Sequence, residues 1–494
     1  MNHSRSSSTD ATTVATDPDS TTQNSPAHSS PDSSSAAAVL AIVLSCYLLI
    51  IVDISIVITG LPEIQQDLGF SSTTLSWVQN IYTLAFGSLL LLGARSGDLL
   101  GRRRMLMIGL TLFALSSLVI GMASSPAMML IGRAVQGAGA AILAPATLAL
   151  LSVYFPEGPQ RVKALAWYAA TAGIGSSLGL VLGGLLAGWL SWRVGFFINA
   201  PFGLLLILAA WKVLDETDTH DGTFDLGGAV TSTLGMSALV FAIVHSSTAG
   251  WGDIYTLIAL TAALLLLSLF VVIEANHHHP LLPLRLFESS ERVVAYLARM
   301  LFLGSMVSFL FFSTQFMQGV LDFTPVEAGF AFLPFTVLTF VASTQVPRLT
   351  RRFGNSQVAL MACVVLAIGM GWLALLDEHS DYWSGLALPM LLIGLGNGAV
   401  LGPLTIAGVS GVNKQDAGAA SGVVNVAHQL GGTLGLSILV VVFAAAGSGL
   451  PDGHHKLAHQ LAAGLDGSFV MLIVAAVLLF GFKRASLTTQ NKRG

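Results

Sequence analysis

The chain has 494 residues, of which 54% are hydrophobic and only 10% are charged, and its formal net charge is −4. Soluble domains carry about 25% charged residues, so this composition excludes a globular protein surrounded by water. Apolar runs of roughly 18 to 25 residues recur from position 36 to position 482. Because a helix satisfies its backbone hydrogen bonds internally, we expect an all-α integral membrane protein.

Taken in chain order, the apolar runs predict fourteen transmembrane helices. They cover about residues 36–61, 77–94, 104–123, 127–152, 163–187, 193–214, 226–246, 254–275, 293–318, 326–346, 356–376, 383–409, 417–446 and 467–483. With the N-terminus inside, 18 of the 22 Lys and Arg residues fall on the cytoplasmic side and only Arg193 and Lys456 outside. Basic residues collect in cytoplasmic loops, so we expect a multi-pass protein of the cytoplasmic membrane with both termini inside.

The polar loops divide the chain into five segments. We expect a disordered cytoplasmic tail at 1–35, a six-helix bundle at 36–214, two linker helices at 215–292, a second six-helix bundle at 293–483 and a cytoplasmic tail at 484–494. A weak internal repeat supports two equivalent bundles, because the loops ARSGDLLGRRRML and RLTRRFGNSQVAL occupy corresponding positions. Transporters built from repeated halves bind substrate near the middle of the membrane, between the halves.

Asp53 and Arg133 lie at similar depths in the first and fourth spans, so we expect their opposite charges to pair. Burial disfavours an ionised carboxylate and a nearby guanidinium favours it, so small changes in spacing or hydration can switch its protonation. Ionisable residues within a membrane commonly relay protons. The alternative is a structural ion pair that fixes helix packing.

The loop GARSGDLLGRRR places Asp98 at the cytoplasmic end of the second span, followed by Gly101, Arg102 and Arg103. Positive-inside anchoring explains the arginines but not the acid. An acid at this point can bond to a helix N-terminus or pair with Arg102, and such a contact can close the cytoplasmic face in one conformation. We therefore predict a cytoplasmic gate.

The fifth span is rich in glycine, with Gly175, Gly179, Gly183 and Gly184 in GIGSSLGLVLGG. This small-xxx-small spacing lets helices approach closely, either as a bending contact or as static packing. The segment GSSLG also matches a nucleophile-elbow pattern, but that motif requires a turn between a strand and a helix. Ser177 lies in mid-span, so we exclude this interpretation.

Several polar side chains interrupt otherwise apolar spans and are candidates to line a substrate cavity. They are Gln79, Tyr82, Gln136, Gln315, Asn397, Asn425 and His428. Each can equally serve as a hydrogen-bonding contact between helices. No metal site is predicted, because the histidine run at 277–279 lacks further ligands at suitable spacing.

Several segments in order resemble the fourteen-helix drug:proton antiporters of the major facilitator superfamily. They are VDISIVITGLP, GARSGDLLGRRR, RAVQGAGA, SLGLVLGG, SWRVGFFINAPFG, HPLLPLRLF and HQLGGTLG. The resemblance implies two bundles, alternating access and proton-driven export in a bacterial membrane. It assigns proton coupling to Asp53 and Arg133 and the gate to Asp98, whereas Leu180 stands where the fifth-helix motif usually has proline.

We therefore expect a proton-coupled exporter of drugs, antibiotics or other amphipathic molecules. A dedicated exporter of one endogenous metabolite, lipid or siderophore is the alternative within this fold, and a channel is the alternative from another class. The sequence lacks a phosphate-binding P-loop and a metalloprotease motif, so no ATP-driven or enzymatic function is expected. The expected partners are the bilayer, a small-molecule substrate and protons, with no cofactor, no nucleic acid and a monomeric state.

Overall fold

The computed structural model describes residues 33–155, 159–216, 225–277, 280, 282–412 and 417–491. Its first part contains α1 (Ser33–Thr59), α2 (Leu61–Leu68), α3 (Ser76–Leu100), α4 (Arg102–Gly121), α5 (Pro126–Tyr154), α6 (Pro159–Trp189), α7 (Trp192–Phe197) and α8 (Asn199–Val213). Next come α9 (Leu226–Ala249), α10 (Ile254–Asn276) and a short 3-10 helix at Leu284–Glu288. The last part contains α11 (Ser290–Gly319), α12 (Pro325–Ala331), α13 (Leu333–Phe353), α14 (Asn355–Leu373), a π-helical turn at Trp383–Ala387, α15 (Leu388–Gly408), α16 (Ala417–Ala446) and α17 (His454–Asn491).

The prediction of an all-α membrane protein is confirmed. Within the described residues, 13 helical segments are long and apolar enough to cross a membrane, and no strand occurs. The remaining expected span, 163–187, lies within α6, where the structure describes only part of the side chains. The predicted tail at 1–35 lies almost entirely outside the described residues.

Two of the expected spans are broken near prolines. The span 193–214 consists of α7 and α8, which meet at Ile198, and the span 326–346 consists of α12 and α13, which meet at Phe332. Pro201 and Pro334 follow these breaks closely. Proline lacks an N–H and its ring collides with the carbonyl four residues earlier, which disfavours a continuous helix through these positions. Each span therefore breaks just before its proline, and a new helix starts there.

Two helix boundaries differ from the predictions. A separate helix, α2, follows the first span and ends at Gly69, whose left-handed φ of 74° terminates it. The last span, expected at 467–483, begins at His454 and its helix continues to Asn491. The hydropathy pattern missed these extensions because helical hydrogen bonds form in polar segments as well as in lipid-facing ones.

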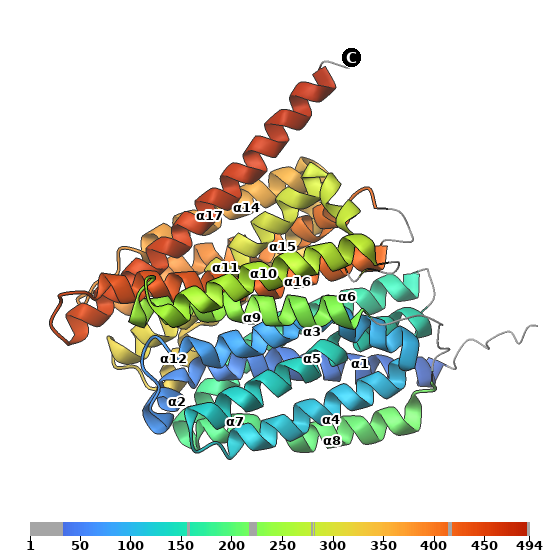
Figure 1. Ribbon diagram of the computed structural model, residues 1–494, viewed down its shortest axis with the longest axis horizontal. Helices are drawn as coiled ribbons and strands as arrows, with labels where there is room; N and C mark the ends of the chain where they lie inside the picture. The colour runs from blue at the N-terminus through green and yellow to red at the C-terminus, as the bar shows by residue number, and fades with distance from the viewer. Residues whose placement is uncertain are drawn as a thin grey trace, which may run out of the picture.

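The helices form two groups that meet along α3 and α16. Helices α1 and α3–α8 pack among themselves, as do α11–α17, and the two groups touch mainly through α3 with α16 and α6 with α12. Helices α9 and α10 pack on each other, and α9 contacts both α3 and α16 across the seam between the groups (Figure 1). The first group is called the N-terminal block and the second the C-terminal block, and the five-segment division of the chain stays a prediction.

The glycines of α6 lie on two faces. A Cβ atom at Gly175 would lie 2.8 Å from Leu48 Cδ1 of α1, and one at Gly179 would lie 2.5 Å from Ser55 Cβ, while Gly183 meets α1 one turn further on. Gly184 instead faces α12, where an added Cβ would overlap the carbonyl oxygen of Pro325. The small residues therefore allow close approach to α1 within the N-terminal block and to α12 across the seam.

Hydrogen bonds across the seam lie toward the predicted outer side. Among the described residues they join Gln318 Nε2 to the Thr59 carbonyl oxygen at 2.9 Å, Asn80 Nδ2 to Ser437 Oγ at 3.0 Å, and the hydroxyls of Thr83 and Thr433 at 2.7 Å. Together with the contact between α6 and α12, these bonds hold the two groups together on the predicted outer side.

We predict that Gly184→Leu opens this closure. The added side chain cannot fit between α6 and α12, so conformations with the outer side closed lose stability relative to those with it open. The measurement is the labelling rate of Val326→Cys, next to the Gly188 position on α6, in a background lacking Cys46 and Cys363. Labelling should rise several-fold.

The control for this prediction is Gly252→Leu, because a Cβ at Gly252 has no atom within 4 Å. Gly184→Ala provides a milder test if the leucine variant misfolds. If a folded Gly184 variant, leucine or alanine, is labelled at the same rate as the Gly252→Leu control, the contact does not control the outer closure.

Candidate functional site

Asp53 forms the centre of a buried hydrogen-bonded cluster in the N-terminal block. Its Oδ2 atom accepts a bond from Arg133 Nη1 at 2.9 Å. Its Oδ1 atom accepts bonds from Gln136 Nε2 at 2.8 Å and from Asn199 Nδ2 at 2.6 Å. The predicted pairing of Asp53 with Arg133 is thus present, and the three donors match the acceptor-only character of an ionised carboxylate.

Arg133 is enclosed on all sides, with 0% of its side chain exposed against 1% for Asp53. Its Nη1 atom also donates to Gln136 at 2.6 Å and its Nε atom to the Val78 carbonyl oxygen at 3.1 Å. The guanidinium lies 4.1 Å from the centre of the Tyr82 ring, within the range of a cation–π interaction. The predicted residues Tyr82 and Gln136 therefore belong to this cluster.

Asn199 and Ser117 belong to the same cluster but were absent from the prediction. Ser117 Oγ accepts from Gln136 at 2.8 Å and from Asn199 at 3.3 Å. The break at Ile198 places Asn199 at the start of α8 and lets its amide reach Asp53. Asn199 is a polar residue within the apolar span expected at 193–214, so the same reasoning that selected the other candidate residues could have selected it.

The turn between α3 and α4 is built around Gly101, whose φ of 98° is unfavourable for other residues. The carboxylate of Glu216 accepts bonds from the backbone N–H groups of Arg103 and Arg104, both at 3.1 Å, at the start of α4. Arg103 also donates to the Trp211 carbonyl oxygen at 2.7 Å. The loop is thus attached to the segment after α8 through Glu216, which the sequence analysis did not identify.

For the other two predicted gate residues, Asp98 and Arg102, the structure does not test a gate function. Arg102 is the first residue of α4, and the side chain of Asp98 lies outside the part of the chain that the structure describes. The gate function of Asp98 stays a prediction.

A second buried polar cluster lies in the C-terminal block. Arg299 Nη1 donates to Thr405 Oγ1 at 2.8 Å, and its Nη2 atom donates to Nδ1 of the predicted residue His428 at 3.2 Å. The cluster joins α11, α15 and α16. It contains no carboxylate among the described residues, in contrast to the cluster around Asp53.

The other predicted cavity residues form local or interhelical contacts. Gln315 donates to the Phe311 carbonyl oxygen at 3.4 Å, and Asn425 donates to the Ser421 carbonyl oxygen at 3.1 Å, in both cases one turn back in the same helix. Asn397 donates to Thr339 across α15 and α13 at 3.3 Å. Gln79 is buried next to the Val78 carbonyl oxygen that binds Arg133.

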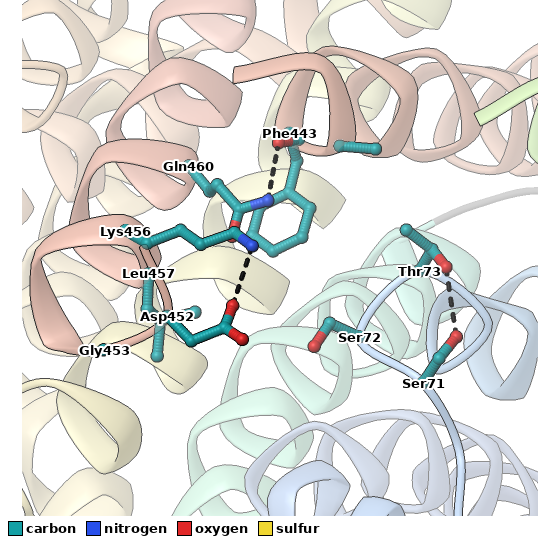
Figure 2. A pocket seen from close by; sticks show the side chains of 10 residues that line it. Ser71, Ser72, Thr73, Phe443, Asp452, Gly453, Lys456, Leu457 and Gln460 are labelled. Atoms are coloured by element: carbon teal, nitrogen blue, oxygen red, sulfur yellow. Dashed lines mark hydrogen bonds and ion pairs between the residues drawn. The ribbon is translucent and has the colours of Figure 1, made fainter. Parts of the chain in front are cut away.

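A cavity of about 430 Å³ lies on the predicted outer side, between the loop at 71–73 and the ends of α16 and α17 (Figure 2). Asp452 and Lys456 form an ion pair of 2.8 Å at its edge. Its lining includes none of the predicted substrate residues. This hollow is part of the outer surface of the seam.

The short helix α2, on the predicted outer side, carries two carboxyl groups whose pKa values are shifted in opposite directions. Glu63 is partly buried and its Oε2 atom has no hydrogen-bond partner among the described residues, and this burial raises the pKa of Glu63 to about 7. The pKa of Asp67, in the same helix, is shifted the other way, because the hydrogen bonds that its carboxylate accepts from Arg193 and Trp192 hold this pKa below its usual value.

Two groups of long apolar helices around buried polar clusters define a multi-pass membrane transporter. A family model described as the Major Facilitator Superfamily matches residues 43–436, and the chain belongs to this family. Family membership makes it a transporter rather than an enzyme.

Two relatives from actinomycetes match most of the chain. The cephamycin export protein of Amycolatopsis lactamdurans is 38% identical over 453 residues, which cover 90% of this chain and 93% of the relative. The puromycin resistance protein of Streptomyces alboniger is 36% identical over 446 residues, covering 90% and 88%. The fold is similar to that of a bacterial homologue of the human lysosomal transporter Spinster in an inward-facing, unoccupied conformation, with a TM-score of 0.69 at 15% identity over 93% of this chain and 99% of that one.

We predict that Arg133→Leu lowers the free energy of unfolding by about 3–5 kcal/mol, because removing one partner of a buried ion pair leaves an uncompensated charge. Thermal unfolding of the purified protein measures the effect. The double variant Asp53→Asn with Arg133→Leu should lose less stability than the two single variants added together.

The control is Lys456→Ala, which removes the partner of Asp452 at the outer surface and should change the stability little. Strict additivity of the two buried substitutions would contradict the coupling of Asp53 with Arg133.

Proposed function

We propose that this transporter exports antibiotics or related amphipathic molecules by exchange for protons. The observation that carries the proposal is the ion pair of Asp53 and Arg133, fully buried within membrane-spanning helices. Maintaining two charges in this environment is costly, and ionisable residues within membranes commonly serve ion movement. The names of the two relatives, which refer to cephamycin export and puromycin resistance, support a small-molecule antibiotic as the cargo.

Proton binding at Asp53 would change the interactions of the whole cluster. Neutralising the carboxylate removes the counter-charge of Arg133 and weakens the bonds from Gln136 and Asn199, which come from α5 and α8. The packing of four helices thereby becomes sensitive to one proton. Glu63, with a pKa of about 7, offers a proton acceptor on the predicted outer side, where protons enter an exporter.

Of the other functions considered, a channel agrees less well with these contacts. A channel has no need for two blocks that are hydrogen-bonded across a closed outer side, whereas alternating access requires such a closure in one conformation. A dedicated exporter of one endogenous metabolite, lipid or siderophore would use the same machinery. We propose a monomer in the cytoplasmic membrane, with both termini inside and the proton gradient as its only energy source.

We predict that Asp53→Asn abolishes proton-driven transport while leaving the protein folded. Asparagine keeps the size and polarity of aspartate but cannot bind and release a proton near neutral pH. In proteoliposomes with an imposed pH gradient, substrate movement should fall to the level of protein-free liposomes. Asp67→Asn, on the outer surface, is the matched control and should transport normally. Gradient-driven transport by Asp53→Asn protein would disprove the proton-coupling role.

We also predict that Asp98→Asn raises the population of molecules open to the cytoplasm. If the carboxylate helps to close that face, losing about 1.4 kcal/mol of differential stabilisation changes the ratio of states tenfold. The measurement is the labelling of single cysteines introduced between positions 347 and 354, after replacement of Cys46 and Cys363. Labelling equal to that of the unmodified protein, with substrate binding retained in both, would show that Asp98 is not a gate.

A further inference from the structure

Arg299 is a buried cation whose charge is not balanced by the protein around it. Only 7% of its side chain is exposed, and it lies nine residues into α11, about 13 Å along the helix axis. Among the described residues no carboxylate lies within ion-pair distance of it, and its Nε atom has no hydrogen-bond partner. This differs from Arg133, whose charge is matched by Asp53.

The neighbours of Arg299 are both neutral acceptors. Thr405 accepts through its hydroxyl, and His428 accepts through Nδ1, so this ring nitrogen carries no proton in the observed arrangement. An isolated charge away from water costs several kcal/mol unless it is paired. The cluster therefore suits a negatively charged group, since at least one N–H donor, that of Nε, is unused among the described residues.

The N-terminal block carries an aromatic pair on helices next to the seam. The rings of Tyr47 in α1 and Tyr168 in α6 are stacked, with centroids 4.0 Å apart and an angle of 11° between their planes. Helix α1, which carries Tyr47, contacts α11, which carries Arg299, across the seam. The cation and the aromatic pair thus belong to neighbouring helices of the two blocks, in the predicted cytoplasmic half of the membrane.

We propose that Arg299, supported by Thr405 and His428, binds an anionic group of the exported molecule, a carboxylate or a group of similar charge and shape. A guanidinium donates parallel hydrogen bonds to a carboxylate, which gives both affinity and orientation. Tyr47 and Tyr168 pack against the apolar body of the same molecule. This proposal rests on the proposed export function and specifies its substrate class.

The test measures binding to the purified full-length protein in nanodiscs of phosphatidylcholine, without any gradient. The probes are two matched pairs, cefoxitin with its methyl ester and 2-naphthoate with its methyl ester. Each carboxylate should bind at least about tenfold more tightly than its ester, as expected for a charge-assisted hydrogen bond. Arg299→Gln, which can still bond to Thr405 and His428, should abolish this preference.

Three controls separate a binding role from a structural one. Arg299→Lys keeps the charge and should retain part of the preference, and Arg193→Gln removes a guanidinium at the outer surface and should retain all of it. Tyr47→Leu should weaken the acid and the ester equally. A merely structural arginine would give equal losses for acid and ester in Arg299→Gln.

The proposal is wrong if the carboxylates bind no better than their esters, or if Arg299→Gln keeps the preference. It is also wrong if adding phosphatidylglycerol to the nanodiscs stabilises the unmodified protein through Arg299 while the carboxylates do not bind, because the site would then hold a lipid headgroup. Intact carboxylate binding without gradient-driven transport would instead contradict proton coupling and leave this proposal standing.

Discussion

A charge buried inside a membrane is costly unless an opposite charge lies beside it, and in the N-terminal block the ion pair of Asp53 and Arg133 meets this constraint. The pair determines local structure around it. Gln136 and Asn199 must be close enough to donate to the carboxylate, and the interruption of the helix at Ile198 makes the second contact possible. Helices α1, α4, α5 and α8 are positioned by this single group of hydrogen bonds.

A short series of contacts leads from this cluster to the closed outer side. Ile56, three residues after Asp53, lies directly against Gly183. A Cβ atom added at Gly183 would be only 2.7 Å from the Cα atom of Ile56. The next residue, Gly184, meets Pro325 of the C-terminal block. A shift of α1 caused by a change of charge at Asp53 would therefore act on α6 and then on α12. These are contacts between packed backbones, which tolerate little independent movement.

The sequence predicted the helices and the acid–base pair because both depend on local or strongly constrained features. Long apolar runs define spans, and two opposite charges at equal depth have few other partners available. It missed Glu216 because a carboxylate in a polar loop gives no sign that it will accept bonds from a distant helix N-terminus. Arg299 falls within the span expected at 293–318, but its proposed role depends on the lack of a nearby acid among the described residues, which only the tertiary arrangement shows.

The repeated turns of the two blocks illustrate the same limit. Gly101 and Gly354, which lie in the two matching loops, both have positive φ values, 98° and 80°. A Cβ at Gly101 would collide with the Glu216 carboxylate, whereas one at Gly354 would meet open space. Among the residues that the structure describes, the repeat preserves the backbone turn but not the acid beside it, so equivalent motifs in the two blocks have different contacts.

Taken together, the proposed roles of Asp53 and Arg299 have a consequence for which component of the proton gradient, the pH difference or the membrane potential, would drive transport. If Asp53 brings one proton inward for each monoanion that leaves by way of Arg299, every cycle moves the equivalent of two positive charges inward, one as the proton and one as the departing negative charge. A membrane potential contributes about 2.3 kcal/mol per charge at 100 mV, so it would supply about 4.6 kcal/mol to such an exchange in addition to the pH gradient. Exchange of one proton for one monovalent cation moves no net charge and uses the pH gradient alone. The unbalanced arginine of the C-terminal block thus links the choice of substrate to the use of the membrane potential.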